Sequence, residues 1–528
     1  MSFEGLPPTF LLLLLLAVNT GICFFGLSTI SLVLQRWLSA SNLKESENPY
    51  ILYSPSNLGS ILGLLSYPFV VERLLRHDSQ SSAWWIGYLL LILILIPCTP
   101  KKVKEEAGED VKSEDLKDSA NTSSPLRWLG LSTCGSALLL ATTNIISFDI
   151  ASTALLWVLP LTLYLLTFVL VFKSKTWFPS CLMTVAFWIL PLGLVIGWFA
   201  ELHIVLPSMI LMGVLYLATL FVLCMCCHGT LHRERPRDPG QLTRFYLYMS
   251  LGGFTGSVFI NWLIPLISDR SIEYPLTLFL TVLLLSYSKG HQATQRTWSY
   301  TAVYLVVLLG VFFVIGKFKV DPQLAFLGIG LLIMLPLIAT KRSPSQFRNF
   351  YACGIIALLA SPYLISSSTN HFFHRNFYGI YKIFDQNGKR HLHHGTTLHG
   401  TQYLDDSDKH FLPLAYYHPN TPSGALLNGN PLGLTRIGMI GLGSGEYLNE
   451  GQSMTVYEQD RDNVEIADSH FTFLQRGRDQ GAEIDFVVGD GRLALKSVED
   501  ESFDLFIVDA FSSDSIPVHL VTVEAMQE

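Results

Sequence analysis

The stretch GLGSGEYLNEGQSMTVYEQD, residues 441–460, decides how the C-terminal part of this 528-residue chain is expected to fold. It begins at the end of the apolar segment LTRIGMIG, and it predicts a strand, a glycine turn, a short helix and a second strand. The backbone can turn tightly and approach a ligand at three glycines, Gly441, Gly443 and Gly445. Glu458 stands near the tip of the second strand, where an acid can accept hydrogen bonds from both hydroxyls of a ribose.

Two further strands are expected after this stretch, and each ends on an acid. AEIDFVVGDGR predicts a third strand that ends on Asp490 and is followed by Gly491, and FDLFIVDA predicts a fourth that ends on Asp509. The carboxyl ends of parallel strands meet at one edge, where open α/β sheets bind their ligands. Glu458, Asp490 and Asp509 are therefore expected to lie together. An alternative is that each acid caps a helix or faces solvent, and for any single one this alternative stays open.

The spacing within this sheet disfavours a nicotinamide cofactor. Glu458 follows Gly445 by 13 residues, whereas a dinucleotide fingerprint places its acid roughly 20 residues on. An acid at the end of the third strand is more typical of sites for S-adenosyl compounds.

A small β unit is expected just before the parallel sheet. FYGIYKIFD and KRHLHHG flank Asn387 and Gly388, which are a strong signal for a type I′ hairpin, and TTLHGTQYL predicts a third strand. Four histidines crowd this unit: His391, His393, His394 and His399. Strand alternation puts the first two on one face and His394 on the other, which disfavours a single metal site.

The composition indicates that most of the chain lies in a membrane. Charged residues make up 15% of the sequence and hydrophobic residues 50%, with a mean hydropathy of +0.39, whereas soluble domains carry about 25% charged residues. We expect a multispan α-helical domain at 1–368, a small β-rich unit at 369–432 and a Rossmann-like S-adenosyl-binding domain at 433–528. About eleven or twelve spans are expected, near 9–31, 52–72, 82–99, 127–147, 151–173, 178–200, 203–226, 244–268, 273–288, 299–316, 323–340 and 349–367.

Lysine and arginine are concentrated in alternate loops, after the first, third, fifth, seventh, ninth and eleventh spans. The positive-inside rule then places the N-terminus outside, and twelve spans would place the tail outside as well. Either one candidate segment does not span, or the tail is exported. Because a nucleotide-using tail belongs with its cofactor, we expect the first of these and a cytoplasmic tail. The predicted location is a multi-pass inner or plasma membrane.

Net charge and cysteines exclude other classes of protein. The charge of −7 excludes a basic nucleic-acid footprint. All eight cysteines lie in the membrane part, and three of them form the stretch CMCCHG with His228. Because a metal centre would want more ligands at regular spacing, we predict thiols at a helix end and no metal.

Several of these segments together resemble spermidine synthase-like proteins: RNFYGIYKI, HGTTLHGTQ, AYYH, GLGSG, YEQD, GDGRLAL and DLFIVDAFSSDSIPVHLVT. The resemblance is closer to the bacterial branch in which this domain is fused to a multispan membrane region. NPYILYSPSNLGSILGLLSYPFVVE, DIASTALLWVLPLTLYLLTFVLVF and LTRFYLYMSLGG are similar to stretches of those fused proteins. It implies transfer of an aminopropyl group from decarboxylated S-adenosylmethionine, a co-substrate, to a diamine such as putrescine. No tightly bound cofactor is implied.

The resemblance also implies roles for single residues. Asp509 matches the catalytic acid, and Asp514, in the loop AFSSDSIP, matches a second ligand of the amine. Gln402 and Tyr417 fall near substrate-lining residues of the family. The cofactor side is matched by the glycine loop with Ser444, by Glu458 at the ribose, and by Asp490 with Gly491 at the adenine.

Three departures from the family pattern bear on function. Ser444 stands where the glycine loop commonly carries an aspartate, and His418 stands where an acid is expected near the amine. The sequence ends at Glu528, in the helix expected after the fourth strand, so the sheet is expected to be incomplete at its C-terminus.

Two alternatives to an aminopropyltransferase remain. One is a membrane transport or binding protein whose tail binds a nucleoside or polyamine without turnover. The other uses intact S-adenosylmethionine on another acceptor. The expected partners are the lipid bilayer and a small polyamine, with no nucleic acid, and the chain is a candidate homo-oligomer.

Overall fold

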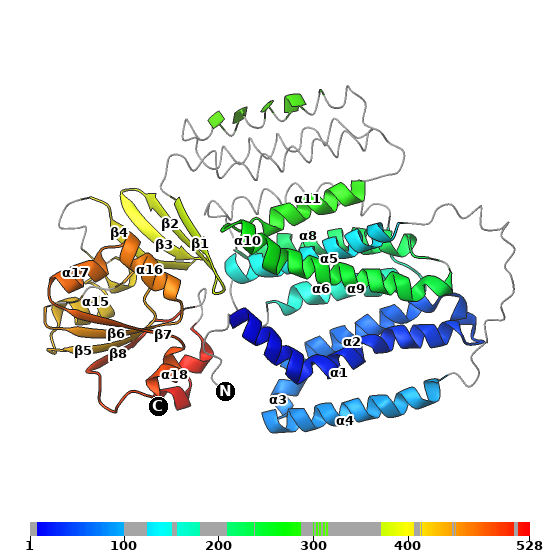
Figure 1. Cartoon of the computed structure of the whole chain (residues 1–528), viewed down its shortest axis with the longest axis horizontal. Coiled ribbons are helices and arrows are strands. Elements are labelled where there is room, and N and C mark those ends of the chain that lie inside the picture. The colour runs from blue at the N-terminus through cyan, green and yellow to red at the C-terminus, as the bar shows by residue number, and fades with distance from the viewer. Residues whose placement is uncertain are drawn as a thin grey trace.

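The structure is a computed structural model. It describes residues 8–99, 124–149, 156–179, 209–236, 238–286, 299, 302–304, 306–307, 310–311, 313–314, 371–395, 397–405, 412, 414–445, 448, 450–511 and 516–527. The N-terminal part of the chain is helical, with several apolar helices, and the C-terminal part contains two sheets (Figure 1).

Long apolar helices dominate the described N-terminal part. The α-helices are α1 (Pro8–Ser39), α2 (Tyr53–Ser66), α3 (Glu72–Leu74), α4 (His77–Leu95), α5 (Pro125–Asp149), α6 (Val158–Phe172), α8 (Met209–Arg233), α9 (Leu242–Val258), α10 (Ile264–Ile267) and α11 (Glu273–Ser286). Shorter 3₁₀ or π segments are η1 (Lys44–Glu47), η2 (Pro49–Leu52), η3 (Tyr67–Val71), η4 (Ile96–Cys98), η5 (Pro239–Gln241) and η6 (Phe259–Leu263).

Among the described residues, five helices are long and apolar enough to cross a membrane. They are Phe10–Ser39, His77–Cys98, Pro125–Ser147, Met212–Arg233 and Leu242–Ile267. Val158–Phe172 and Glu273–Leu285 are shorter apolar helices. The predicted span 52–72 is divided here between α2 and the π segment η3. The predicted spans 323–340 and 349–367 lie outside the described residues, as do most of 178–200 and most of 299–316, so the full count stays a prediction.

The closest helix packing is that of α5 against α9, and two glycines make it possible. A Cβ added at Gly252 would lie 2.6 Å from the Leu129 carbonyl oxygen, and one at Gly256 would lie 2.7 Å from the Thr133 carbonyl oxygen. The Ser132 hydroxyl donates to the Met249 carbonyl oxygen across the same interface, at 2.7 Å. In lipid, moving an apolar side chain from the lipid tails into a helix interface gains little free energy. Helices there associate instead through close packing at small residues and through hydrogen bonds between helices.

The first sheet of the C-terminal part is a small antiparallel one with strand order β1-β2-β3-β4. Its strands are β1 (His371–Arg375), β2 (Ile380–Gln386), β3 (Lys389–His394) and β4 (Thr397–Tyr403). Asn387 and Gly388 have φ of +54° and +73°, and both central residues of a type I′ turn require such values, so the predicted hairpin is confirmed. The register of β3 with β4 shifts between Leu392 and His393, which leaves His399 as an extra residue in β4.

The second sheet is parallel, with strand order β7-β6-β5-β8. The C-terminal part contains η9 (Ala415–Tyr417), α15 (Pro422–Gly429), β5 (Arg436–Ile440), β6 (Ser453–Glu458), α16 (Arg461–His470), α17 (Phe473–Asp479), β7 (Glu483–Val488), α18 (Gly491–Leu495), β8 (Leu505–Val508), η10 (Val518–Leu520) and α19 (Val523–Gln527). The four strands predicted from the sequence are therefore present. The strand order reverses between β5 and β8, and such a reversal is where open parallel sheets bind ligands.

Two local predictions differ from the structure. The segment RDNVEIADSHFTFL, 461–474, whose pattern predicts a single helix, forms two helices. Phe471 is extended and buried, and the Thr472 amide donates to the Gln402 side chain, 3.3 Å away. The short helix expected after Gly445 is not seen in the described residues there, which form turns; residues 446, 447 and 449 lie outside them.

We expect Gly252→Ala to lower the stability of the helical part, because the new methyl group would overlap the α5 backbone. Overpacking of this kind costs about 1–3 kcal/mol. The control is Gly253→Ala, one residue away, where a Cβ would have nothing within 4 Å. Thermal unfolding of the detergent-solubilised chain should show a lower midpoint for the first variant only. Equal midpoints would mean that α5 and α9 are not packed this closely.

Candidate active site

The glycine loop after β5 is held against the end of β8. Gly441 has φ of +90°, and a Cβ there would overlap the Asp509 carbonyl oxygen. The Gly441 amide donates to the Tyr457 carbonyl oxygen at 2.9 Å, and the Asp509 amide donates to the Ile440 carbonyl oxygen at 2.9 Å. Only a glycine allows this approach, so the loop and Asp509 lie at one edge of the sheet.

Glu458 is buried at the end of β6, next to the same loop. Its Oε2 accepts from the Leu442 amide and from Asn463 Nδ2, and its Oε1 accepts from the Asp460 amide, each at 3.0 Å. Burial raises the pKa of the Glu458 carboxyl, and these hydrogen bonds act against that rise. Since a carboxylate has about four acceptor positions, roughly one is left for a ligand.

Asp509 lies beside Tyr417 on the other side of the loop. The Tyr417 hydroxyl donates to Asp509 Oδ2 at 2.6 Å. Tyr417 is carried by η9, which the chain enters through Ala415 with φ of +59°. Burial raises the pKa of the Asp509 carboxyl, and the hydrogen bond from Tyr417 opposes the rise. The pair joins two residues that the sequence analysis assigned separately to the catalytic acid and the substrate-lining tyrosine.

Asp490 lies at the same edge, beyond the end of β7. Its Oδ1 accepts from the Leu493 amide at 3.0 Å, which makes it the N-cap of α18, and His519 Nε2 lies 3.4 Å from its Oδ2. A Cβ on Gly491 would lie 2.9 Å from the Ile440 side chain. Capping is the alternative that the sequence left open for each acid, and for Asp490 the structure shows it.

The small sheet covers the outer side of the glycine loop. Ser444 is buried, and its hydroxyl occupies the space that a Cβ on Gly400 would need. A Cβ on Gly443, which has φ of +58°, would lie 2.8 Å from the His399 carbonyl oxygen. The bulge in β4 therefore lies against the loop. The His399 Nε2 atom is buried and has no hydrogen-bond partner, and burial lowers the pKa of this imidazole to about 4.

Of the remaining predicted site residues, Gln402 and Gly445 make contacts within the fold. The Gln402 amide nitrogen donates to Thr472 Oγ1, and its Oε1 accepts from the Thr472 amide at 3.3 Å, so this side chain holds the start of α17. Gly445 has φ of +92° and packs against Leu474. Asp514 lies outside the described residues.

A polar network that the sequence analysis missed surrounds Asp460. Its Oδ2 accepts from Asn376 Nδ2 at 2.7 Å and from the Tyr381 hydroxyl at 2.8 Å. Its Oδ1 accepts from the Asp462 amide at 3.0 Å, which caps α16. The Asp462 carboxylate accepts from Asn376 at 2.8 Å and lies 2.7 Å from His374 Nε2. These two side chains lower the pKa of the Asp462 carboxyl, His374 most strongly. An acid just before a helix can be recognised in a sequence as a cap, but its partners Asn376, which follows β1, and Tyr381 on β2 cannot.

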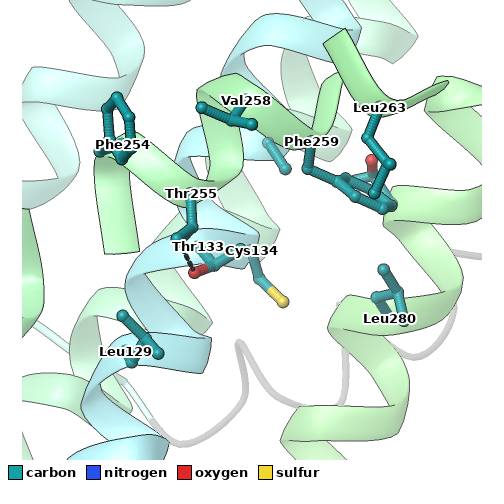
Figure 2. Close-up of a pocket in the computed structure, with 11 residues that line it drawn as sticks. Leu129, Thr133, Cys134, Phe254, Thr255, Val258, Phe259, Leu263 and Leu280 are labelled. Carbon is teal, nitrogen blue, oxygen red and sulfur yellow. Dashed lines mark hydrogen bonds between the residues drawn. The ribbon is translucent and has the colours of Figure 1, made fainter. Parts of the chain in front are cut away.

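Metal-ligating clusters and pockets elsewhere in the described part are the other places where a site could lie. No group of three or more His, Cys, Asp or Glu side chains that could hold a metal occurs there. A pocket of about 430 Å³ opens between α5, α9, η6 and α11 (Figure 2). Its lining is apolar except for Thr133, Cys134, Thr255 and Thr277, and the Thr133 and Thr255 hydroxyls bond to each other at 2.8 Å. The acid–base groups thus gather at the edge of the parallel sheet.

Comparison with known proteins gives one relevant similarity. A polyamine aminopropyltransferase of Vibrio vulnificus (strain CMCP6) is 28% identical to this chain in an alignment of 188 positions, which covers 33% of this chain and 59% of that relative. The chain therefore spans less than two thirds of the relative's length. No protein-family model and no solved structure matches the chain. The similarity supports a spermidine synthase-like region and suggests a transferase.

Proposed function

We propose that the chain is a membrane-anchored aminopropyltransferase that moves the aminopropyl group of decarboxylated S-adenosylmethionine to a diamine such as putrescine. The observation that carries this proposal is the Asp509 carboxylate, half-buried and hydrogen-bonded by Tyr417 at the sheet edge beside Gly441. The partial similarity to a polyamine aminopropyltransferase supports the same class of reaction.

The chemistry needs a base more than an acid. The nitrogen of the amine attacks the aminopropyl carbon next to the sulfonium, the carbon–sulfur bond breaks, and its electron pair returns to sulfur. Methylthioadenosine therefore leaves as a neutral molecule. The amine, with a pKa of about 10 like that of lysine, must first lose a proton. Asp509 is the group proposed to hold the ammonium and take that proton.

The nucleoside would lie along the carboxyl edge of a Rossmann-like sheet. Glu458 Oε1 has room to accept one ribose hydroxyl. Asp490 and Gly491 would border the adenine, and the glycine loop with Ser444 would approach the sulfonium side.

The amine side would be completed by Tyr417, Gln402 and Asp514. Gln402 would act there indirectly, because its side chain donates a hydrogen bond to Thr472, which precedes α17. The lipid bilayer and a small polyamine are then the partners, and self-association is a further expectation. Decarboxylated S-adenosylmethionine is consumed as a co-substrate.

A second candidate is a membrane transport or binding protein whose tail binds a nucleoside or polyamine without turnover. The observation that favours it is Ser444, a neutral side chain buried against Gly400 where a charge would help to hold a cationic ligand. A third candidate keeps the transferase class but uses intact S-adenosylmethionine on another acceptor. Product analysis separates the three.

We expect purified chain to release methylthioadenosine from decarboxylated S-adenosylmethionine when a diamine is present, and Asp509→Asn to abolish most of that release. Loss of a positioned general base costs about 10²–10⁴-fold in rate. The measurement is mass spectrometry of methylthioadenosine and of the new polyamine. Asp500→Asn, at an exposed residue before β8, is the control. Binding of methylthioadenosine without any product would favour the second candidate, and a different product the third.

The rate should fall as the pH drops through the raised pKa of Asp509, because only the ionised carboxylate can take the proton. Tyr417→Phe removes a hydrogen bond that favours the charged form, so the acid limb of kcat should move to higher pH. A hydrogen bond to a charged group is worth about 1.5–3 kcal/mol, which corresponds to roughly one pH unit or more. Tyr416→Phe, at the exposed neighbour, should leave the profile in place. A shift to lower pH in Tyr417→Phe would contradict this assignment.

A further inference from the structure

The soluble tail is joined to the helical part by a buried ion pair. Arg375, the last residue of β1, places its Nη2 atom 2.5 Å from Glu273 Oε1 at the start of α11. The two side chains are 8% and 4% exposed. Next to them the Arg270 guanidinium lies 4.3 Å from the centre of the Phe373 ring. In Figure 1, β1 is the strand of the small sheet that faces α10 and α11.

The ion pair between Arg375 and Glu273 should hold β1 against the start of α11. Two charges removed from water are tolerated only when they are paired, and loss of one partner leaves the other buried and unpaired. The carboxylate of Glu273 also lies in the first turn of α11, where the helix dipole favours a negative charge. The end of β1 is therefore fixed by a residue of the helical part.

The residues on either side of Arg375 reach into the candidate site. Asn376 donates to both Asp460 and Asp462, and His374 lies within hydrogen-bond distance of Asp462. The Asp460 amide in turn donates to Glu458 Oε1, the oxygen with room for a ribose hydroxyl. The chain of links from Glu273 to Glu458 thus consists of an ion pair, the peptide bond between Arg375 and Asn376, and two hydrogen bonds that meet at Asp460.

We propose that Glu273, a residue of the helical part, is a positioning residue for nucleoside binding by the tail, acting through Arg375 and Asn376 on Asp460 and Glu458. The helical part would then complete the nucleoside site as well as anchor it. This inference rests on the proposed function for its ligand, but the contacts that carry it are independent of the reaction.

The test measures the Kd of methylthioadenosine by equilibrium dialysis on the full chain in detergent. Glu273→Gln and Arg375→Gln should each weaken binding about 3- to 10-fold. The double variant should lose no more than either single variant, because it leaves no unpaired buried charge. The matched control is Glu234→Gln, which breaks the 2.8 Å ion pair with Arg127 inside the helical part and should leave the Kd unchanged.

Hydrogen exchange gives a second readout that needs no ligand. Peptides that cover the first turn of α16, residues 460–466, should exchange faster in Glu273→Gln than in the wild type, and at the wild-type rate in Glu234→Gln. Unchanged exchange in Glu273→Gln would overturn the inference whatever the binding result. Failure of the wild type to bind methylthioadenosine, with the exchange effect present, would instead count against the proposed function alone.

The distribution of basic residues carries a second inference, on the side of the membrane that the tail faces. The Tyr50 hydroxyl donates to the Pro236 carbonyl oxygen, and the Arg233 guanidinium lies over the Phe178 ring, so the loops after α1, α6 and α8 meet at one end of the bundle. That end carries most of the described Lys and Arg residues of the helical part: Arg36, Lys44, Arg127, Lys173, Lys175, Arg233, Arg235 and Arg244.

The tail contacts the opposite end of the bundle. The helical segment Leu242–Ile267 runs without a break from the basic end of the bundle to the opposite end (Figure 1). There the chain turns, and the Arg270 guanidinium lies over the Phe373 ring of the tail. The described basic residues at this end are Arg73, Arg76 and Arg270. Since short loops rich in Lys and Arg stay in the cytoplasm, we infer that the tail faces the non-cytoplasmic side, which is the alternative to the cytoplasmic tail expected from the sequence. A co-substrate would then have to reach the tail from that side.

Labelling of intact cells with a membrane-impermeant maleimide tests the orientation. The tail has no cysteine, so Glu499→Cys on its surface and Lys175→Cys at the basic end serve as a pair, read by peptide mass spectrometry. We expect Glu499→Cys to be labelled in intact cells and Lys175→Cys only after permeabilisation. The reverse pattern would overturn the inference, and neither result depends on the proposed reaction.

Discussion

The close approach of backbone to backbone at the glycine loop is the constraint on which the candidate site depends. Gly441 leaves space for the Asp509 carbonyl oxygen on one side, and Gly443 leaves space for the His399 carbonyl oxygen on the other. A side chain at either position would separate β5 from β8, or the parallel sheet from the small sheet. Because the Leu442 amide between them also binds Glu458, one short loop sets the positions of both buried acids.

The small sheet is the structural link between the two ends of the molecule. One side of it packs on the glycine loop through β4, and its edge strand β1 is paired with α11 through Arg375. Asp460 collects hydrogen bonds from Asn376 and Tyr381, so the start of α16 is held by the small sheet as well. A shift of β1 would therefore move the start of α16, and this is the contact through which the helical part is proposed to act on the nucleoside site.

The three acids at the sheet edge differ in the hydrogen bonds that their carboxylates accept. Glu458 accepts three hydrogen bonds from residues of the glycine loop and the start of α16, and Asp490 accepts one from the first turn of α18. Asp509 instead accepts from the side chain of Tyr417 in η9. Burial and a single hydrogen bond leave Asp509 with acceptor capacity for a cation and a raised pKa. Among the described acids of this edge, it is the one best suited to hold an ammonium and take its proton.

The sequence by itself determined the strands, the hairpin at Asn387 and Gly388, and the grouping of Glu458, Asp490 and Asp509, because alternation, glycine placement and strand ends are local patterns. Only the tertiary structure decided that Gln402 binds Thr472, that Asp490 caps a helix, and that Tyr417 meets Asp509. The same is true of the pair between Glu273 and Arg375, two residues that lie 102 positions apart. Contacts between distant residues follow from how whole elements pack, and a single sequence carries no local signal for them.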